Sequence, residues 1–382
     1  MSTLNFEPLE FPQNAPQLRR DVRSFLGETL ARRTVAQRAR SWSAFDAEFS
    51  RALGRRGWIG MTWPRIYGGQ DRSAIERYVV LEELLAAGAP VGAHWIADRQ
   101  SGPLLLRYGT EEQRRRLLPD MIRGEVYFCI GMSEPGAGSD LAALRTRATP
   151  VAGGWRVNGS KIWTTNADRA HFMIALVRTS GETAGRHQGL SQLLIDLKSS
   201  GVTVRPIADL VGDRHFSEVF FADVFVPETM LIGGEGEGWT QVTAELALER
   251  SGPERYLSSY CLLDAFVRAA ALSCASSVRA HIGVFAAQLW TLRQMSMSLA
   301  GQLAQGRDPA LEAAIVKDLG TAFEQDIPKV LHGIADPELL GSAAGDILEA
   351  IEYLVQISPT FSLRGGTREI LRGIIARGLS LR

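Results

Sequence analysis

Residues 126–140 read Val-Tyr-Phe-Cys-Ile-Gly-Met-Ser-Glu-Pro-Gly-Ala-Gly-Ser-Asp, and the character of the chain changes along them. Residues 126–133 form a short apolar run that is typical of a buried strand, and a Gly-rich turn follows it. Before this stretch the apolar positions have helical spacing, as at Ile75, Val79 and Val80. We therefore expect a helical region to end here and a region of strands to begin.

The residues after the Gly-rich turn predict several more strands. Stretches rich in β-branched, aromatic and aliphatic residues lie at 171–179, 190–197, 202–206 and 217–226. In 154–159, the pair Asn158-Gly159 is a strong signal for a hairpin turn. Helical spacing returns from about Gly236 and continues towards the C-terminus.

This order of elements predicts a mainly α protein with a central β domain. We expect an N-terminal helical domain at 1–126, a middle antiparallel β barrel or sandwich at 127–235, and a C-terminal bundle of the four-helix type at 236–382. A doubly wound nucleotide-binding fold is disfavoured, because strands do not alternate with helices and no GxGxxG follows a first strand.

Capping residues predict two helix starts in the N-terminal region. Ser43 is the expected cap of a helix that runs through Phe45 and Phe49. Thr110 is followed by two glutamates, which suit the positive end of a helix dipole, and it is the expected cap of a second helix.

The composition excludes several classes of function. The 42 basic and 42 acidic side chains cancel, and no basic stripe with interleaved aromatics is present, so nucleic acid is not an expected partner. The histidines show no HxxxH or HExxH spacing, so we expect no metal site. No apolar run reaches the ~18 residues of a membrane span, and residues 1–14 lack the pattern of a signal peptide. These features predict a cytoplasmic protein without a membrane span.

Three segments resemble a known family. Residues 133–140 read Ser-Glu-Pro-Gly-Ala-Gly-Ser-Asp, residues 160–166 read Ser-Lys-Ile-Trp-Thr-Thr-Asn, and residues 365–372 read Gly-Gly-Thr-Arg-Glu-Ile-Leu-Arg. The first two resemble the flavin-binding segments of acyl-CoA dehydrogenases, and the third resembles their C-terminal loop. The helix–strand–helix order is similar to that of the family across the whole chain.

The resemblance implies FAD as the cofactor and an acyl-CoA, or a thioester on a carrier protein, as the substrate. It places Ser139 and Arg250 beside the substrate. It assigns to the cofactor Ile130, Met132, Ser133, Gly138, Ser139, Trp163, Thr164, Thr165, Arg279, Thr367 and Glu369.

The residue types themselves suit a flat cofactor. A Gly-rich turn frees backbone N–H groups and admits a ligand closely, and Trp163 offers a broad surface for a flavin ring. Ser133 and Thr165 carry hydroxyls able to donate hydrogen bonds to flavin N5 or to its pyrimidine edge. Each feature also has an ordinary structural reading, as a tight turn, as core packing or as strand-end capping.

The implied reaction needs a carboxylate that removes the α-proton while flavin N5 takes hydride from the β-carbon. Most members of the family carry this carboxylate directly before the Gly-Thr of the C-terminal loop, where this chain has Gly365. A minority, similar to isovaleryl-CoA dehydrogenase, place it before an arginine on the first long C-terminal helix, which matches Glu249 and Arg250 here. Glu249 is therefore the expected base, with Glu245 and Glu254 in reserve; the alternative is a solvated helix face or a structural ion pair.

Two segments depart from the family pattern. The Arg-x-x-Phe-Gly segment that reaches the FAD of a neighbouring subunit matches 279–283 only loosely, with Ile282 in place of Phe. The later Gly-rich loop near Gly341 is hardly recognisable. We expect either a homo-oligomer or a hetero-oligomer with a homologous chain that supplies the better half-site.

Three functional readings remain open. The first is an FAD-dependent acyl-CoA dehydrogenase, with a preference for branched or bulky acyl groups and with electron-transferring flavoprotein as the implied electron acceptor. The second is a non-catalytic or half-site subunit of a mixed assembly. The third keeps the fold but uses it for a flavin-dependent oxidase or monooxygenase.

Overall fold

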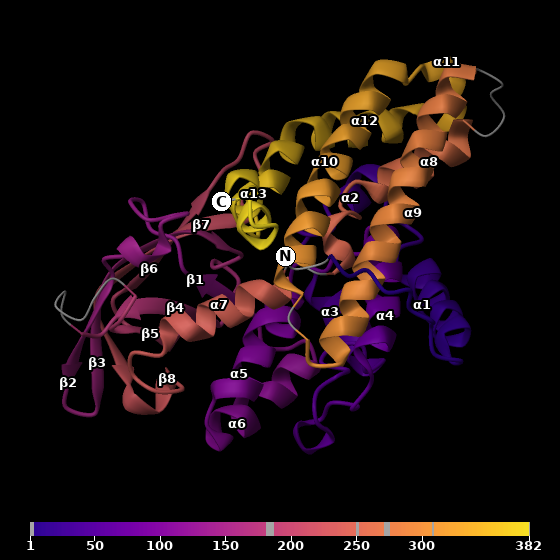
Figure 1. Cartoon of the computed structure of the whole chain (residues 1–382). Helices are drawn as coiled ribbons and strands as arrows, with labels where there is room; N and C mark the ends of the chain where they lie inside the picture. The colour runs from indigo at the N-terminus through magenta and orange to yellow at the C-terminus, as the bar shows by residue number, and fades with distance from the viewer. Residues whose placement is uncertain (1–3, 181–186, 250–251, 271–275, 308, 382) are drawn as a thin grey trace. The chain divides into compact units, whose positions relative to one another are not determined.

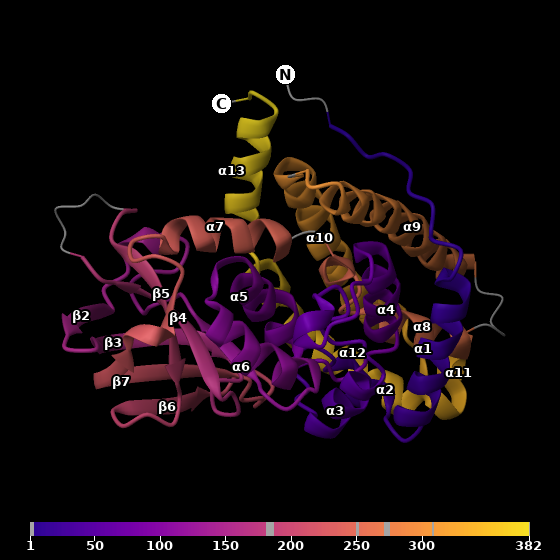
Figure 2. The ribbon, with the colours of Figure 1, turned by 90° about the horizontal axis from the view of Figure 1, so that it is seen from below.

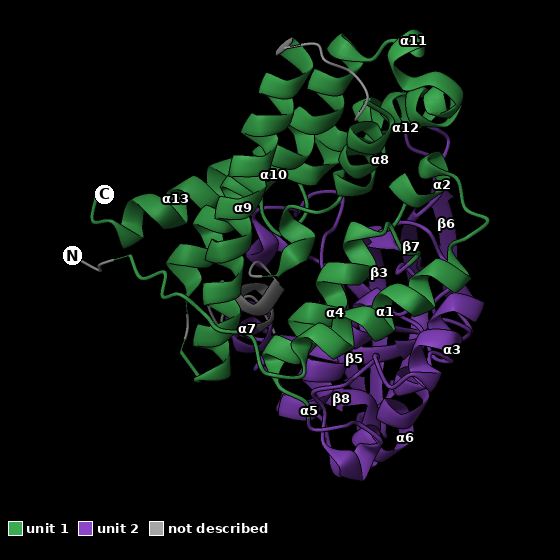
Figure 3. Ribbon diagram, turned by 90° about the vertical axis from the view of Figure 1, so that its right-hand side faces the viewer, with its two compact units in different colours: residues 1–42, 72–90, 247–382 green, residues 43–71, 91–246 purple. Residues whose placement is uncertain are grey.

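The structure is a computed structural model, and it describes residues 4–180, 187–249, 252–270, 276–307 and 309–381, with the side chains of 245–249 and 276 excepted. The chain forms two compact units (Figure 3). The first comprises residues 1–42, 72–90 and 247–382, and the second comprises 43–71 and 91–246. The division at residues 126 and 235 into three domains stays a prediction.

The second unit contains one mainly antiparallel sheet in the order β6-β7-β3-β2-β4-β5-β8, with β1 added on β4. Among the named strands of the described residues, the pairings of β1 and of β2 with β4 are parallel, and an isolated bridge between Leu190 and Glu237 is parallel as well. The predicted strands are thus confirmed. Their bounds are β1 Phe128–Gly131, β2 Arg147–Val151, β3 Gly154–Thr165, β4 Phe172–Arg178, β5 Leu190–Asp196, β6 Val202–Ile207, β7 Phe216–Pro227 and β8 Leu231–Ile232 (Figure 1).

The predicted hairpin turn at Asn158-Gly159 is wrong, because β3 continues through both residues and pairs with β7. The turn between β2 and β3 lies at residues 152–153, where Gly153 has φ +77°. Asn158 instead exchanges two hydrogen bonds with Asp223, which has φ +52° where the register of β7 shifts. Asn158 therefore stabilises a bulge in the neighbouring strand β7 and does not form a turn.

Both faces of the sheet are buried in the part formed by β1, β4 and β5, whereas alternate residues of β2, β3 and β6 are exposed. One face forms a core to which β1–β5 and β7 all contribute, with Trp155, Met173 and Phe221 among its members. On the other face, residues of β1, β4, β5 and β8 pack with Leu104 and Leu118 of two helices. Among the described residues, this unit contains the α-helices α3 Ala47–Arg55, α5 Gly102–Tyr108 and α6 Glu111–Ile122, together with most of α7 Gly238–Glu249.

The caps of these helices test two predictions. Thr110 caps α6, since its hydroxyl accepts from Gln113 N and the Gln113 side chain accepts from Thr110 N. The cap predicted at Ser43 is wrong, because α3 begins at Ala47 and the Asp46 side chain accepts from Phe49 N at 2.8 Å. A carboxylate at the N-cap also interacts favourably with the helix dipole.

The first unit is helical. Its helices are α1 Ala15–Thr29, α2 Val35–Ala39, α4 Ala74–Ala86, α8 Tyr260–Ala270, α9 Ser276–Ala304, α10 Ala310–Ile334, α11 Pro337–Leu340, α12 Ala344–Ile357 and α13 Arg368–Gly378; α7 Gly238–Glu249 ends in this unit. The long helices α9 and α10 run side by side (Figures 1 and 2). Helix α10 also packs on α12 and α13. The mainly α fold with a central β region is thus confirmed.

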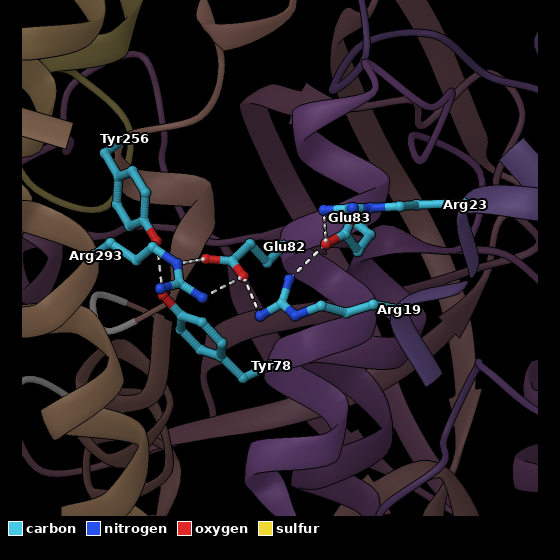
Figure 4. Close-up of polar contacts among 7 residues, drawn as sticks. All are labelled: Arg19, Arg23, Tyr78, Glu82, Glu83, Tyr256 and Arg293. Carbon is cyan, nitrogen blue, oxygen red and sulfur yellow. Dashed lines mark hydrogen bonds and ion pairs between the residues drawn. The ribbon is translucent and has the colours of Figure 1, made fainter. Parts of the chain in front are cut away.

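A polar network joins α1, α4 and α9 inside the first unit (Figure 4). Glu82 accepts from Arg293 Nε at 2.6 Å and lies 2.7 Å from Arg19 Nη2. The hydroxyls of Tyr78 and Tyr256 are 2.6 Å apart. Burial raises the pKa of both tyrosines, so both remain neutral and hydrogen-bonding. The network fixes the packing of three helices that are distant in sequence.

Candidate functional site

The Gly-rich segment after β1 folds into a tight turn. Glu134 N donates to Ala137 O at 2.9 Å and Ala137 N donates to Glu134 O at 3.0 Å, which closes the turn over Pro135 and Gly136. Ile162 N donates to Ser133 O at 2.9 Å. This bond brings the two segments singled out in the sequence side by side within one unit.

The turn has one anchored side and one open side. Met132 and Ala137 pack into a small apolar cluster, whereas Gly138 and Ser139 are exposed. A Cβ at Gly138 would meet no atom within 4 Å. Ser133 and Ile130 are half-buried. The backbone of the turn therefore has room for a ligand.

Trp163 lies on a bulge of β3. Between the pairs Lys161–Val219 and Thr164–Ser217, β3 contains one more residue than β7. Trp163 has φ +60°, which is rare for a residue with a side chain, and it is 57% exposed. A large exposed aromatic in a strained backbone conformation is a sign of function, because folding alone does not favour it.

The two threonines after Trp163 differ in their surroundings. Thr165 is half-buried and ends β3. Thr164 is 1% exposed, and its hydroxyl has no hydrogen-bond partner in the described part of the chain. Thr164 is therefore enclosed in this conformation, whereas Thr165 is in part accessible.

Three residues that support this region were missed by the sequence reasoning. Asn166 has φ +54°, and its N–H donates to His215 O at 2.7 Å, which turns the chain directly after the bulge. Glu134 and Lys161 form a buried ion pair of 2.8 Å beneath the turn. The available signal was that Glu134 and Lys161 lie inside the two segments that the sequence analysis had singled out.

The C-terminal loop belongs to the other unit, where Gly365 has φ +70° and Gly366 has φ +101°. Thr367 caps α13, and its hydroxyl accepts from Ile370 N at 3.4 Å. Glu369 is exposed in the first turn of this helix. Its pKa is lowered, first by its own backbone N–H and then by Thr367. Both residues thus have an ordinary role at the helix start.

The buried Arg255 faces Gly365, the position at which most acyl-CoA dehydrogenases, the family that the sequence resembles, carry the catalytic base. A Cβ at Gly365 would lie 3.2–3.4 Å from the guanidinium atoms of Arg255, a residue that is 1% exposed. The neighbouring Arg364 lies 3.1 Å from Glu324 on α10 and stacks over Trp42, 4.2 Å from the ring centroid. Burial lowers the pKa of Arg364. Two arginines, Arg255 and Arg364, therefore lie near Gly365, and the second is paired with the carboxylate of Glu324.

The remaining predicted residues are placed as follows. Helix α7 ends at Glu249, but the side chains of Glu245 and Glu249, and Arg250 as a whole, lie outside the described residues. Glu254 is fully buried, and its carboxylate folds back so that a Cβ on Gly252 would lie 2.0 Å from it. Arg279 is exposed on α9.

The structure brings one group of predicted residues together in the second unit, namely Ile130, Met132, Ser133, Gly138, Ser139, Trp163, Thr164 and Thr165. Thr367 and Glu369 lie on one turn of the first unit. In the described ranges, no group of three His, Cys, Asp or Glu side chains could hold a metal ion. A search of the same ranges finds no helix with the length and apolar character to cross a bilayer.

The sequence matches two domain models. Residues 12–125 match "Acyl-CoA dehydrogenase, N-terminal domain" and residues 129–224 match "Acyl-CoA dehydrogenase, middle domain". Acyl-CoA dehydrogenase FadE26 of Mycobacterium tuberculosis is 30% identical over 406 residues, covering 97% of this chain and 98% of the relative. The chain belongs to the acyl-CoA dehydrogenase family. The family and enzyme class predicted from sequence are thereby confirmed.

Other relatives differ in length or in extent of match. The aligned part of the chain spans only 45% of FadE34 of Mycobacterium tuberculosis, at 31% identity over 335 residues and 86% of this chain. Isovaleryl-CoA dehydrogenase of Solanum tuberosum is 31% identical over 252 residues, which is 64% of this chain and 61% of that relative.

Two solved structures have the same fold over almost the whole chain. The "Tcur3481-Tcur3483 steroid ACAD" has a TM-score of 0.86 at 28% identity and covers 98% of this chain and 99% of its own. The ChsE4-ChsE5 complex from Mycobacterium tuberculosis has a TM-score of 0.83 at 29% identity and covers 98% of both chains. An FAD complex of PigA, at 23% identity, shares the fold.

Proposed function

We propose that this chain binds FAD and oxidises an acyl thioester at its α and β carbons. The observation that carries the proposal is Trp163, which is exposed at positive φ on a bulge beside the 132–140 turn. This residue lies in the segment that resembles the flavin-binding part of the family. FAD, when bound, would accept a hydride at N5 from the substrate.

Several residues of the flavin segments have separate roles in the proposal. Trp163 covers the flavin ring, and the backbone N–H groups of the open turn face it. The hydroxyls of Ser133 and Thr165 donate to polar atoms of the ring, and Met132 provides apolar contact. Ser139 on the exposed side of the turn contacts the substrate. Arg279, Thr367 and Glu369 are proposed contacts to the rest of the cofactor.

Glu249 is the proposed base that removes the α-proton, with Arg250 beside the substrate. Gly365 cannot accept a proton. Glu254 is a weaker candidate, because its carboxylate lies against Gly252 of its own turn. Its charge also acts to raise the pKa of Arg364. Glu249 directly precedes Arg250, as the base precedes an arginine in the minority of the family that this chain resembles at 248–250.

The preferred substrate in this proposal is a bulky acyl thioester. A glycine at 365 removes the side chain that the usual loop base would place beside the α and β carbons. The related Tcur3481-Tcur3483 protein, described as a steroid ACAD, supports this direction. Electron-transferring flavoprotein is the proposed acceptor of the electrons.

The test is anaerobic reduction of the flavin by a panel of thioesters. The purified chain should bind FAD, bulky acyl groups should bleach it faster than straight medium chains, and Glu249→Gln should retain FAD but slow bleaching roughly 10²-fold or more. Glu245→Gln, which changes the reserve candidate on the same helix, should bleach at the wild-type rate if Glu249 is the base. A colourless protein at saturating FAD refutes the proposal, and a Glu249→Gln variant as fast as wild type refutes the base.

A second function, a half-site subunit in a mixed assembly, is favoured by the weak match at 279–283 and near Gly341. The ChsE4-ChsE5 and Tcur3481-Tcur3483 structures are each named for two different chains, which supports it. Mass and flavin content of the chain expressed alone decide between the two. One tightly held FAD per chain in a stable homo-oligomer with full turnover eliminates the need for a partner.

A further inference from the structure

The proposed function gives no role to the buried ion pair beneath the flavin segments. Lys161 is 0% exposed and Glu134 is 8% exposed, and Lys161 Nζ donates to Glu134 Oε1 at 2.8 Å. Replacing a buried pair of this kind by apolar side chains of similar size is often neutral or stabilising, so stability is a poor reason for its presence. The contacts of the pair suggest that it sets the shape of the site.

Glu134 connects three segments of the second unit. Its carboxylate accepts from Arg145 N at 2.6 Å, from Thr146 N at 2.9 Å and from Lys161 on β3. Its own backbone forms both hydrogen bonds with Ala137 that close the Gly-rich turn. One carboxylate therefore fixes the turn to the approach of β2 and to the middle of β3.

Lys161 connects the turn to the bulge. Its ammonium also donates to Met132 O at 3.2 Å, and two residues later on the same strand Trp163 projects from the surface. The stem of Lys161 passes close to Gly131, where a Cβ would lie 3.1 Å from Lys161 Cγ and 2.4 Å from Met173 Sδ. A glycine at 131 thus leaves space for the lysine to reach the turn.

The charges of the pair support each other. Burial lowers the pKa of Lys161 to about 8, against the opposing effect of Glu134. Burial acts to raise the pKa of Glu134, but Lys161 and the donors at 145 and 146 outweigh it, so that this pKa lies below its usual value. The pair is ionised at neutral pH, and both partners have full hydrogen-bonding strength.

We propose that Glu134 and Lys161 are positioning residues, whose ion pair holds the 132–140 turn and the Trp163 bulge in the one arrangement that receives the flavin ring. The inference rests on the proposed binding of FAD and deepens it. Neither side chain is assigned to the reacting atoms. Their effect passes through the backbone of Met132 and Ser133 and through the placement of Trp163.

The test compares Lys161→Met and Glu134→Gln with Lys198→Met, which makes the same change at an exposed lysine of the same unit. In the apoprotein, trypsin should cut at Arg145 or Arg147 faster in the first two variants. Glu134→Gln loses one of the two oxygens that hold this segment, and Lys161→Met leaves the buried carboxylate without its ionic partner. The dissociation constant of FAD should rise by about 10-fold or more. The visible circular dichroism of bound flavin should change, which a loss of general stability does not cause. The control should match wild type in all three measurements.

The outcomes are separable. A wild-type protein that binds no FAD refutes the proposed function, and with it the role in holding a flavin. If the wild-type protein binds FAD and the folded variants show the same affinity and the same visible circular dichroism of the flavin, the positioning role is overturned. That result leaves the proposed function intact. If Lys161→Met does not fold, Glu134→Gln decides, because it keeps the size of the side chain and one of the two oxygens that accept from Arg145 N and Thr146 N. If the loss of FAD affinity in the double variant equals the sum of the losses in the two single variants, the residues act independently. That result also counts against a shared role.

Discussion

Restoring a carboxylate at residue 365 should not restore catalysis, although most of the family has its base there. The change is Gly365→Glu in the Glu249→Gln background. Two features oppose it: φ is +70°, and the new Cβ would lie 3.2–3.4 Å from the Arg255 guanidinium. A side chain at this φ costs roughly 1–2 kcal/mol. An adjacent arginine lowers the pKa of a carboxyl by about 1–3 units, which makes it a weaker base.

The assay is stopped-flow reduction of the flavin by an acyl thioester, with urea unfolding of the same proteins. Reduction should stay roughly 10²-fold below wild type, and the free energy of unfolding should fall by about 1–2 kcal/mol. Gly365→Asn tolerates positive φ while adding a Cβ, so its comparison with Gly365→Ala separates backbone strain from crowding against Arg255. Recovery to within about 10-fold of wild type would show that a carboxylate at 365 can act as a base, and would refute the reasoning.

Two further predictions concern the first unit. Glu82→Gln removes the charge shared by Arg19 and Arg293 and should lower the free energy of unfolding by ~2 kcal/mol or more. Glu7→Gln, at an exposed ion pair, should change the urea midpoint little. If the two variants lower stability equally, the polar network does not stabilise the first unit as inferred. Burial acts to raise the pKa of Glu76, but its hydrogen-bond donors lower it from 4.5 to about 2. Its contribution, up to ~3 kcal/mol, is therefore complete above pH 5 and lost as the pH falls towards 2. Glu76→Gln should flatten the dependence of stability on pH between 5 and 2, and an unchanged slope would reject this assignment.

Much of the fold could be predicted because its signals are local. The spacing of apolar residues gave α4, and the residue type at the cap gave the start of α6 at Thr110. The cap of α3 was misplaced because Ser43 and Asp46 are both acceptable caps, and only the position of the first helical turn distinguishes them. Asn158-Gly159 was misread because its partner, Asp223, is 65 residues away.

The candidate site could be predicted as segments but not as a geometry. The residue order around Trp163 identified the segment, whereas the bulge that exposes Trp163 arises from pairing with β7. Lys161 and Glu134 are 27 residues apart, and no periodicity connects them. The arginine that faces Gly365 likewise lies 110 residues earlier in the chain, because tertiary packing rather than local pattern sets that contact.

Residue 163 is subject to two opposing requirements, the stability of the fold and the binding of the cofactor. For folding alone, asparagine or glycine would suit φ +60° better and would remove a large apolar ring from water. Selection for heat resistance alone would therefore tend to discard the tryptophan, and selection for cofactor retention would keep it. Attempts to engineer a more robust protein by stability-guided substitution should hold position 163 fixed, together with the strand register that bends the chain around it.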